Sequence, residues 1–410
     1  MVSHVRAPGA TRLAAPAVLT LPPGDGVLAR QHLELAIAAG VIAADSPVPE
    51  ANLQPASVDL RLGRVAYPVQ GSFLPYTDEV ERKLAVHKIA EVDLDGDGAI
   101  LYVKQPYLIP LAERLALPEG MAAKANPKSS TGRADVFTRV ITDYSDRFDE
   151  VVDGYCGPLY LEVVPLSFPI RVHAGMSLNQ LRLSVGRAAL SDEELRRFHA
   201  ETHPLLYLDD KPIDVDHLPV ANGLFLGLDL RGDKYRRVGY RAREHPPLLD
   251  LSSRTQDPSR FWEVAVRERH SHTIVLSPER FYLLMSNEAV SIPPELASEM
   301  TAYDPTSGEL RTHYAGFFDP GFGYDADGTR HGSRAALEVR AHDVAFMIEH
   351  GQRVCRLTFD RMLETPDRLY GEGIGSNYQR QEETLSKHFA KPRVRLAPPP
   401  EQPRLFGPES

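Results

Sequence analysis

An internal repeat constrains the fold of this chain more than any other feature of its sequence. Landmarks of the first half recur either 175 residues on (Glu113 and Glu288) or 176 residues on (Glu162 and Glu338), so one single-residue insertion separates the two registers. The other recurring landmarks are Leu117-Pro118 with Ile292-Pro293, Gly175 with Gly351, and Leu181 with Leu357. Self-similarity at a fixed period is the signature of a duplicated structural unit. The sequence therefore predicts two copies of one domain in tandem.

Short runs in which apolar and polar residues alternate occur in both copies. They include residues 58–62, 159–164 and 353–359, and Pro (34 residues) and Gly (29 residues) punctuate the chain between such runs. Alternation with a period of two is typical of strands that bury one face. Helical periodicity is clear in few places, among them residues 29–42 and 191–202, and the second of these begins with the Ser-x-x-Glu spacing of a capping box. The pattern predicts a mostly β protein with a few short helices.

The repeat and the composition together divide the chain. We predict a first domain at residues 27–186, a polar helical linker at 187–222 and a second domain at 223–388. The Ala- and Pro-rich start, residues 1–26, and the Pro-rich end, residues 389–410, bury too little apolar surface to fold, so both are predicted to be disordered tails.

Composition restricts the classes of function. The net charge of −10 argues against a general binder of DNA or RNA, which needs basic surface to meet phosphates, but it leaves room for a local basic pocket that binds one nucleotide. Cys156 and Cys355 are too few for a disulfide framework and fit a reducing cytoplasm. No run of 18 apolar residues is present, so no membrane association is expected.

Several short segments, in a fixed order, point to a nucleotide site. In the first copy they are Gln54–Gly63, Lys128-Ser129-Ser130-Thr131-Gly132-Arg133, Leu161-Glu162-Val163, Pro169-Ile170, Gly175-Met176 and Gln180-Leu181. In the second copy they are Ala315–Phe322 and the tail residues Tyr370, Tyr378 and Gln381. In order and spacing these segments resemble the dCTP deaminases of the dUTPase superfamily, over about residues 27–186 and 223–388.

The resemblance implies a fold and a reaction. The fold would be two tandem dUTPase-like domains, each a distorted β-barrel or jelly roll, in chains that form homotrimers with active sites between neighbouring domains. The reaction would be hydrolytic deamination of dCTP to dUTP and ammonia, which feeds dUMP and thymidylate synthesis. A glutamate would activate the water, Mg²⁺ would accompany the triphosphate, and no zinc would take part.

Two glutamates are candidates for that catalytic role. Glu162 and Glu338 each lie within an apolar strand, and a carboxylate in a dry pocket has a pKa raised toward neutrality, as a general base needs. A solvated strand face is the simpler alternative for both. The apolar run Val163-Val164-Pro165 after Glu162 indicates burial, whereas Arg340, His342 and Asp343 after Glu338 suggest an exposed stretch. The sequence therefore favours Glu162.

A polar loop in the first copy is the candidate phosphate site. Lys128, Ser129, Ser130 and Arg133 offer two cations and two hydroxyls, which suit phosphate oxygens, although an exposed Asn-Pro turn is an alternative. Arg133 is also a candidate for holding the attacking water. The corresponding stretch of the second copy, residues 303–309, carries acids that would repel a triphosphate. The two copies are thus predicted to have specialised.

Base and sugar binding are predicted from the second copy. The resemblance assigns this role to Ala315 and Asp319, with Tyr370 and Gln381 from the closing tail, whereas Asn377 stands where the family has a lysine. A site could therefore combine the phosphate loop of the first copy with the pocket of the second, or form between first copies of adjacent chains.

Other functions stay open at this point. dUTP diphosphatase activity, or both activities in one enzyme, would use the same scaffold, and a nucleotide-binding relic without turnover would explain the degraded motifs. The His199-Ala200-Glu201 triplet spells the His-x-Glu of zinc-dependent nucleobase deaminases, but the Pro-Cys-x-x-Cys that accompanies it is absent from the sequence.

Overall fold

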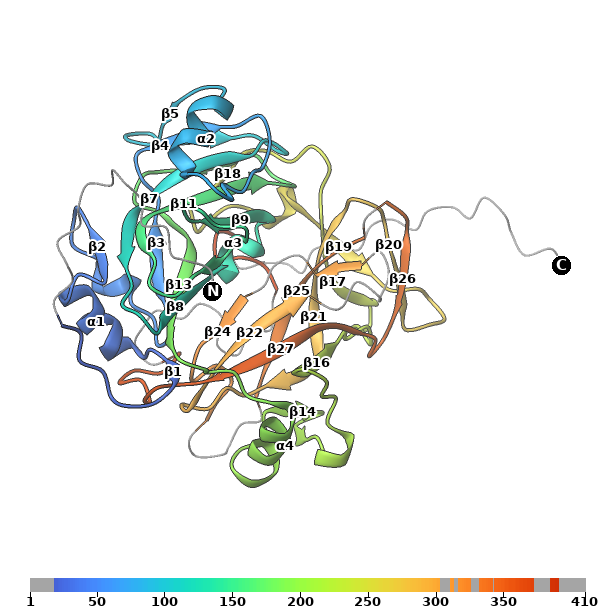
Figure 1. Cartoon of the computed structure of the whole chain (residues 1–410). Coiled ribbons are helices and arrows are strands. Elements are labelled where there is room, and N and C mark those ends of the chain that lie inside the picture. The colour runs from blue at the N-terminus through green and yellow to red at the C-terminus, as the bar shows by residue number, and fades with distance from the viewer. Residues whose placement is uncertain are drawn as a thin grey trace.

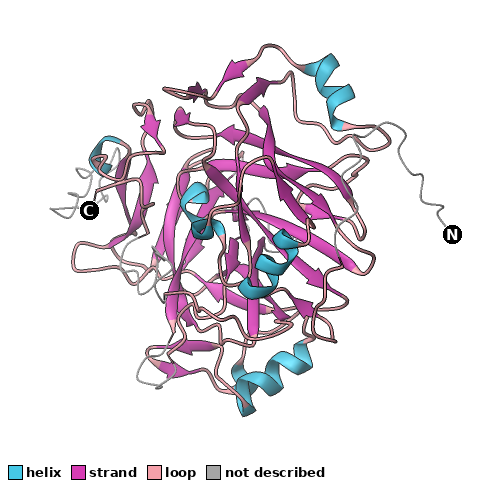
Figure 2. Cartoon of the chain, turned by 90° about the vertical axis from the view of Figure 1, so that its left-hand side faces the viewer, coloured by secondary structure: helices cyan, strands magenta, loops and turns pink. Residues whose placement is uncertain are grey.

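The computed structural model describes residues 18–302, 310–312, 316–325, 332–341, 343–371 and 384–390. Strands make up most of the body of the molecule and four α-helices accompany them within these residues (Figure 1, Figure 2). The predicted mostly β fold with a few short helices is confirmed. The predicted tails lie largely outside the described residues.

The first copy is built from two larger sheets and one small sheet. One sheet has the order β5 (Val92–Asp93), β4 (Val65–Pro68), β7 (Tyr107–Ala116), β11 (Cys156–Pro165), β9 (Val136–Ile141), with β2 (Ile42–Ala44) also on β7. The other has the order β1 (Gly26–Val27), β13 (Ser177–Val185), β8 (Met121–Pro127), β10 (Glu150–Val151), with β3 (Val58–Arg61) also on β13. The helices of this copy are α1 (Arg30–Ala38), α2 (Val80–His87) and α3 (Ser129–Gly132), and η1 (Glu50–Asn52) is a 3₁₀ turn.

The second copy repeats this plan. Its first sheet has the order β15 (Lys211–Pro212), β14 (Leu206–Leu208), β21 (Phe281–Val290), β17 (Arg237–Ala242), β19 (Trp262–Val266), with β25 (Ser333–Ala341) on β21 and β23 (Leu310–Thr312) on β25. Its second sheet has the order β16 (Leu224–Gly227), β27 (Arg353–Arg361), β22 (Leu296–Ala302), β24 (Gly316–Phe318). A two-stranded sheet pairs β20 (Thr273–Leu276) with β26 (Phe346–Glu349), and α4 (Asp192–Glu201), η2 (Val215–His217) and η3 (Pro258–Arg260) complete the copy.

Strand register shows how closely the copies correspond. Glu162 of β11 lies opposite Leu108 of β7, and Glu338 of β25 lies opposite Leu283 of β21. Both members of this cross-strand pair are therefore shifted by the repeat found in the sequence. The two candidate glutamates occupy equivalent positions, so any difference between them comes from what each one faces.

The two copies pack against each other along an extensive boundary. Strand β12 (Ile170–Val172) of the first copy pairs with β6 (Ala99–Leu101) and, in parallel, with β18 (Leu249–Asp250) of the second copy. Beside this strand, the ring of Phe168 lies 5.2 Å from Trp262 and 5.7 Å from Phe261 between ring centroids. Figure 1 shows α3 at this boundary. Because one apolar core extends across both copies, their relative position is part of the folded structure.

The segment between the copies contains the predicted helix. In α4 the Ser191 hydroxyl accepts from the Glu194 backbone NH (3.3 Å) and the Glu194 carboxylate accepts from the Ser191 NH (2.8 Å), so the expected capping box is present. Leu195 packs into the core of the second copy. His199 is buried there with its ring nitrogens bonded to the backbone at Leu205 and Ile213 (3.0 and 2.7 Å), which gives it a structural role.

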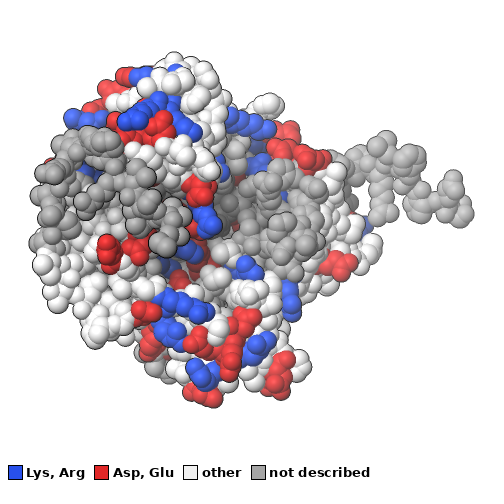
Figure 3. Space-filling view, viewed as in Figure 1, with Lys and Arg blue, Asp and Glu red and all other residues white. Residues whose placement is uncertain are grey.

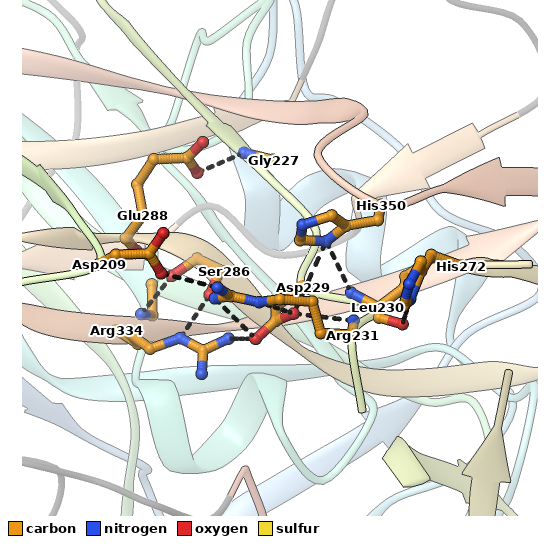
Figure 4. Close-up of polar contacts among 11 residues, drawn as sticks. Asp209, Gly227, Asp229, Leu230, Arg231, His272, Ser286, Glu288, Arg334 and His350 are labelled. Atoms are coloured by element: carbon orange, nitrogen blue, oxygen red, sulfur yellow. Dashed lines mark hydrogen bonds and ion pairs between the residues drawn. The ribbon is translucent and has the colours of Figure 1, made fainter. Parts of the chain in front are cut away.

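An ionic network joins the edges of the second copy around Asp229 (Figure 4). The Asp229 carboxylate accepts from the Arg231 side chain (3.1 Å) and from Arg334 on β25 (2.6 Å), and Arg231 also binds Asp209 (2.7 Å). Burial by itself would raise the pKa of Asp229, but the hydrogen bonds from Arg231 and the charge of Arg334 outweigh it and hold this pKa below its usual value. The network links β14, β16 and β25.

Charge and hydropathy of the described parts agree with a folded β protein. On the face shown in Figure 3, acidic and basic side chains lie interspersed. None of the helices that the structure describes is long and apolar enough to cross a membrane.

Candidate active site

The polar loop of the first copy folds into the short helix α3 directly after β8. The Lys128 carbonyl accepts from the NH groups of Thr131 (2.8 Å) and Gly132 (3.1 Å), and the Ser129 carbonyl accepts from the Arg133 NH (3.1 Å). Ser130 and Arg133 are buried, so an exposed turn is the wrong description of this loop. Buried hydroxyl and guanidinium groups need polar partners, and the structure provides them from the second copy and from strand β3.

The cations of the loop are held from several sides. Lys128 forms an ion pair with Asp59 of β3, and the Arg133 Nε donates to the Ser129 hydroxyl (3.0 Å). Burial raises the pKa of Asp59, and the neighbouring charge of Lys128 opposes that rise. The four predicted phosphate-binding residues are therefore brought together, with Asp59 as an additional member that the sequence placed only in a strand signature.

Glu338 of the second copy reaches this loop. A Cβ atom built on Gly132 would lie 2.5 Å from Oε2 of Glu338, a distance that real Cβ contacts do not show. Glycine is thus required at position 132 because the carboxylate occupies the space. Burial raises the pKa of Glu338 to about 8, the positive charge of Arg133 opposes the rise, and the negative charge of Asp135 adds to it. A proton-accepting carboxyl group and a cationic loop thus meet across the boundary between the copies.

Glu162 lies in a different environment. It is buried as expected, with 2% exposure, but the Arg139 guanidinium binds its Oε1 through Nη2 (2.5 Å) and Nε (3.0 Å). Arg139 in turn stacks on Phe148, with Cζ 3.5 Å from the ring centroid, and donates to the Ser72 hydroxyl (2.7 Å). The carboxylate of Glu162 is therefore neutralised within its own copy.

The reasoning from strand neighbours needs one correction. Arg340 does not mark an exposed stretch after Glu338: its side chain is 5% exposed and pairs with Asp135 of the first copy. Glu338 itself is only 9% exposed. An arginine can be buried when a carboxylate from elsewhere in the chain compensates it, and the residues adjacent in sequence do not reveal that partner.

The predicted base pocket adjoins the same loop. Asp319 pairs with Arg182 of β13 (3.1 Å), and the Arg182 Cζ lies 4.0 Å from the ring centroid of Phe317. Burial raises the pKa of Asp319 against the charge of Arg182, and Asp59 and Lys128 also act on it, which places Asp319 in the electrostatic environment of the phosphate loop. The Tyr370 NH donates to the Pro320 carbonyl (2.8 Å), so this tail residue contacts the pocket hairpin. Ala315, Gln381, Asn377 and residues 303–309 lie outside the described residues.

A C-terminal segment that sequence reasoning did not assign, residues 384–390, covers the loop. The Ser386 hydroxyl donates to the Ser130 carbonyl (2.9 Å), and the Arg133 Nη1 donates to the Thr384 carbonyl (3.4 Å). Burial, with the charges of Lys128 and Arg254, lowers the pKa of Lys387 to about 8. A hydroxyl and a cation shortly after Gln381 were the available signal. Arg254 gave no local signal, because it belongs to a loop of the second copy.

The comparisons with known proteins agree with this arrangement. The family model for the N-terminal domain of 2'-deoxycytidine 5'-triphosphate deaminase matches residues 24–187, and that for its C-terminal domain matches residues 191–389. A crystal structure of 2'-deoxycytidine 5'-triphosphate deaminase from Agrobacterium tumefaciens is similar, with 44% identity, a TM-score of 0.78 and coverage of 86% of this chain and 99% of that chain.

Curated relatives match over shorter lengths. A protein of Coprothermobacter proteolyticus named "dCTP deaminase, dUMP-forming" is 28% identical over 33% of this chain and 69% of its own length. A protein of Beutenbergia cavernae with the same name is 29% identical over 38% of this chain and 77% of its own length. The chain belongs to the dCTP deaminase family and carries both of its domains.

Proposed function

We propose that this protein hydrolyses dCTP to dUTP and ammonia at a site formed within one chain by the α3 loop of the first copy and Glu338 of the second. The observation that carries the proposal is the contact between the Glu338 carboxylate and Gly132. It brings a carboxyl group with a pKa of about 8 beside two cations and two hydroxyls suited to a triphosphate. Glu162, which strand neighbours favour, lacks such a partner loop and is bound to Arg139.

Glu338 can move every proton that the reaction requires. Its carboxylate takes a proton from water as the oxygen bonds to the cytosine carbon that bears the amino group, and it passes this proton to the adjacent ring nitrogen. It then takes the proton of the new hydroxyl and delivers it to the amino nitrogen. The carbon–nitrogen bond breaks, ammonia leaves and the carbonyl of uracil forms. A group with a pKa near neutrality can both accept and donate under these conditions.

The α3 loop would bind the triphosphate. Charge-assisted hydrogen bonds from Lys128, Arg133 and the hydroxyls of Ser129 and Ser130 contribute about 1.5–3 kcal/mol each. Lys387 adds a cation from the covering segment. We propose that the substrate is the Mg²⁺ complex of dCTP, with the ion held by phosphate oxygens and no zinc in the reaction. Among the residues that the structure describes, no cluster of three or more His, Cys, Asp or Glu side chains could hold a metal ion.

One assay tests the proposal. Purified protein is incubated with dCTP and Mg²⁺, nucleotides are separated, and ammonia and pyrophosphate are measured separately. Equal amounts of ammonia and dUTP, unaffected by a zinc-selective chelator, support it. Stoichiometric zinc together with loss of activity on chelation contradicts the zinc-free mechanism. Binding of dCTP without turnover would instead support a nucleotide-binding relic.

A second candidate is a bifunctional enzyme that also releases pyrophosphate. The names of the two curated relatives, which describe those proteins as dUMP-forming, favour it. Its signature in the same assay is pyrophosphate equal to ammonia, with dUMP as the nucleotide product. The homotrimer stays a prediction, for which sedimentation is the measurement. A monomer that retains full activity would contradict the trimer and agree with a site inside one chain.

A further inference from the structure

A buried ion pair crosses the boundary between the copies immediately beside Glu338. Arg340, two residues further along β25, donates through Nη2 to Oδ2 of Asp135, two residues beyond Arg133. We infer that Asp135 and Arg340 are positioning residues, whose ion pair holds the Glu338 carboxylate against Gly132 and shapes the electrostatic field in which it works. The inference rests on the proposed function, since it concerns the same carboxylate.

Asp135 is fixed to the phosphate loop. Its φ of 53° is in the left-handed region, which Asp tolerates better than most residues. Its NH donates to the Gly132 carbonyl (2.8 Å) and its carbonyl accepts from the Leu166 NH (2.9 Å). The Ser167 hydroxyl donates to the carboxylate from the same neighbouring segment. A side chain held by this many bonds gives β25 a rigid contact point on the first copy.

Arg340 is equally constrained from the second copy. Side chains two apart in a strand point to the same face, so Glu338 and Arg340 are both directed toward the first copy. Arg340 also donates through Nη1 to the Glu279 carbonyl, and its Cζ lies 5.9 Å from the ring centroid of Phe281, its cross-strand neighbour. Fixing Arg340 therefore fixes the section of β25 that carries Glu338.

Burial makes the pair consequential. The side chain of Asp135 is fully buried and that of Arg340 is 6% exposed. Removing one partner leaves an uncompensated buried charge, which typically destabilises by about 3–5 kcal/mol. A double variant that removes both charges avoids this cost, so Asp135→Asn with Arg340→Gln is the informative change.

The field around Glu338 has two identified contributors. Arg133 lowers its pKa and Asp135 raises it, both from the first copy, while Arg340 on its own strand neutralises Asp135. Asp135→Asn removes the negative contributor, so the carboxyl group should ionise at lower pH. The acid limb of kcat/KM for dCTP is expected to move down by about 1 pH unit. Looser positioning of the base is expected to lower kcat by about 10- to 100-fold.

The experiment compares pH profiles of the wild type, Asp135→Asn, the double variant and Arg340→Lys. Arg340→Lys keeps the charge and is expected to lower kcat while leaving the acid limb near its wild-type position. The control is Glu299→Gln, which alters another contact between the copies (Asn126 Nδ2 to Glu299 Oε1, 2.8 Å), one that does not involve Glu338. It should leave the limb in place.

Two outcomes separate this inference from the proposed function. A folded double variant with the wild-type kcat and pH profile overturns the inference while the function stands. If the wild type releases no ammonia from dCTP, the function fails. The Glu338 titration, followed by carboxyl carbon-13 NMR against a Glu338→Gln reference, then still tests the inference, because a titration unchanged by Asp135→Asn overturns it.

Discussion

Glu162 and Glu338 occupy equivalent strand positions in the two copies, yet they meet opposite surroundings. Glu162 is bound by Arg139 of its own copy, whereas Glu338 crosses the boundary and contacts the α3 loop of the other copy. The first arrangement stabilises an ionised carboxylate as part of the fold. The second raises the pKa of the carboxyl group to about 8, in the range that acid–base chemistry uses. The comparison teaches that duplication preserved the position of the glutamate while its function came to depend on the partner.

The largest expected effect is a difference in turnover between two isosteric changes. Glu338→Gln should lower kcat for dCTP by about 10³-fold, the scale of a lost general base, while Glu162→Gln should change kcat only about twofold. Ammonia release measures turnover, and dCTP binding to each folded variant is the control. The reverse pattern would move the chemistry to the first copy, as strand neighbours predict.

The loops offer the next comparison. Ser129→Ala and Arg133→Ala should each lower kcat/KM by about 100-fold, since each removes a donor from the phosphate and transition-state environment. Asp304→Ala, in the acidic stretch of the second copy, should stay within about twofold of the wild type. Steady-state kinetics with dCTP provides the measurement. Equal losses from both loops would show that the copies have not specialised.

Gly132 tests the contact between the copies directly. A methyl group there would lie 2.5 Å from the Glu338 carboxylate, so Gly132→Ala must displace either α3 or the glutamate. We expect kcat to fall by about 10- to 100-fold, the scale of a misplaced catalytic group. Gly71→Ala is the matched control, because its added methyl group meets nothing within 4 Å. Wild-type activity of Gly132→Ala would contradict the composite site.

The smallest effect is on stability, and it has opposite signs in the two copies. With a pKa of about 8 when folded and an ordinary value of 4.5, Glu338 binds a proton in the folded state that the unfolded chain has released between these values. Its contribution to stability therefore falls as pH rises from 4.5 through 8. Glu338→Gln removes this loss, so Tm at pH 9 should rise by about 2–5 °C and change less at pH 5.

Glu162→Gln should do the opposite. It leaves the Arg139 guanidinium without its counter-ion, which costs about 1–3 kcal/mol. Thermal denaturation of both variants at the two pH values checks the pair of predictions. A stabilised Glu162→Gln, or a Glu338→Gln destabilised at pH 9, would contradict the assignment of their environments.

Local patterns in the sequence determined a large part of this protein. The repeat predicted two copies, and strand register bears it out at Glu162 and Glu338. Alternation predicted the β elements, and the Ser191 and Glu194 spacing predicted the capping box of α4. The loop chemistry at residues 128–133 was also visible. These features depend on residues near one another in the chain, where periodicity and capping act directly.

The tertiary structure alone decided which glutamate meets the phosphate loop. A period of two tells which side chains share a strand face, but it does not tell what that face will contact. Arg139 reaches Glu162 from 23 positions away, and Arg340 reaches Asp135 from 205 positions away. Burial of charge depends on such distant partners, because a charged group leaves water only where a compensating group has been brought to it by the fold.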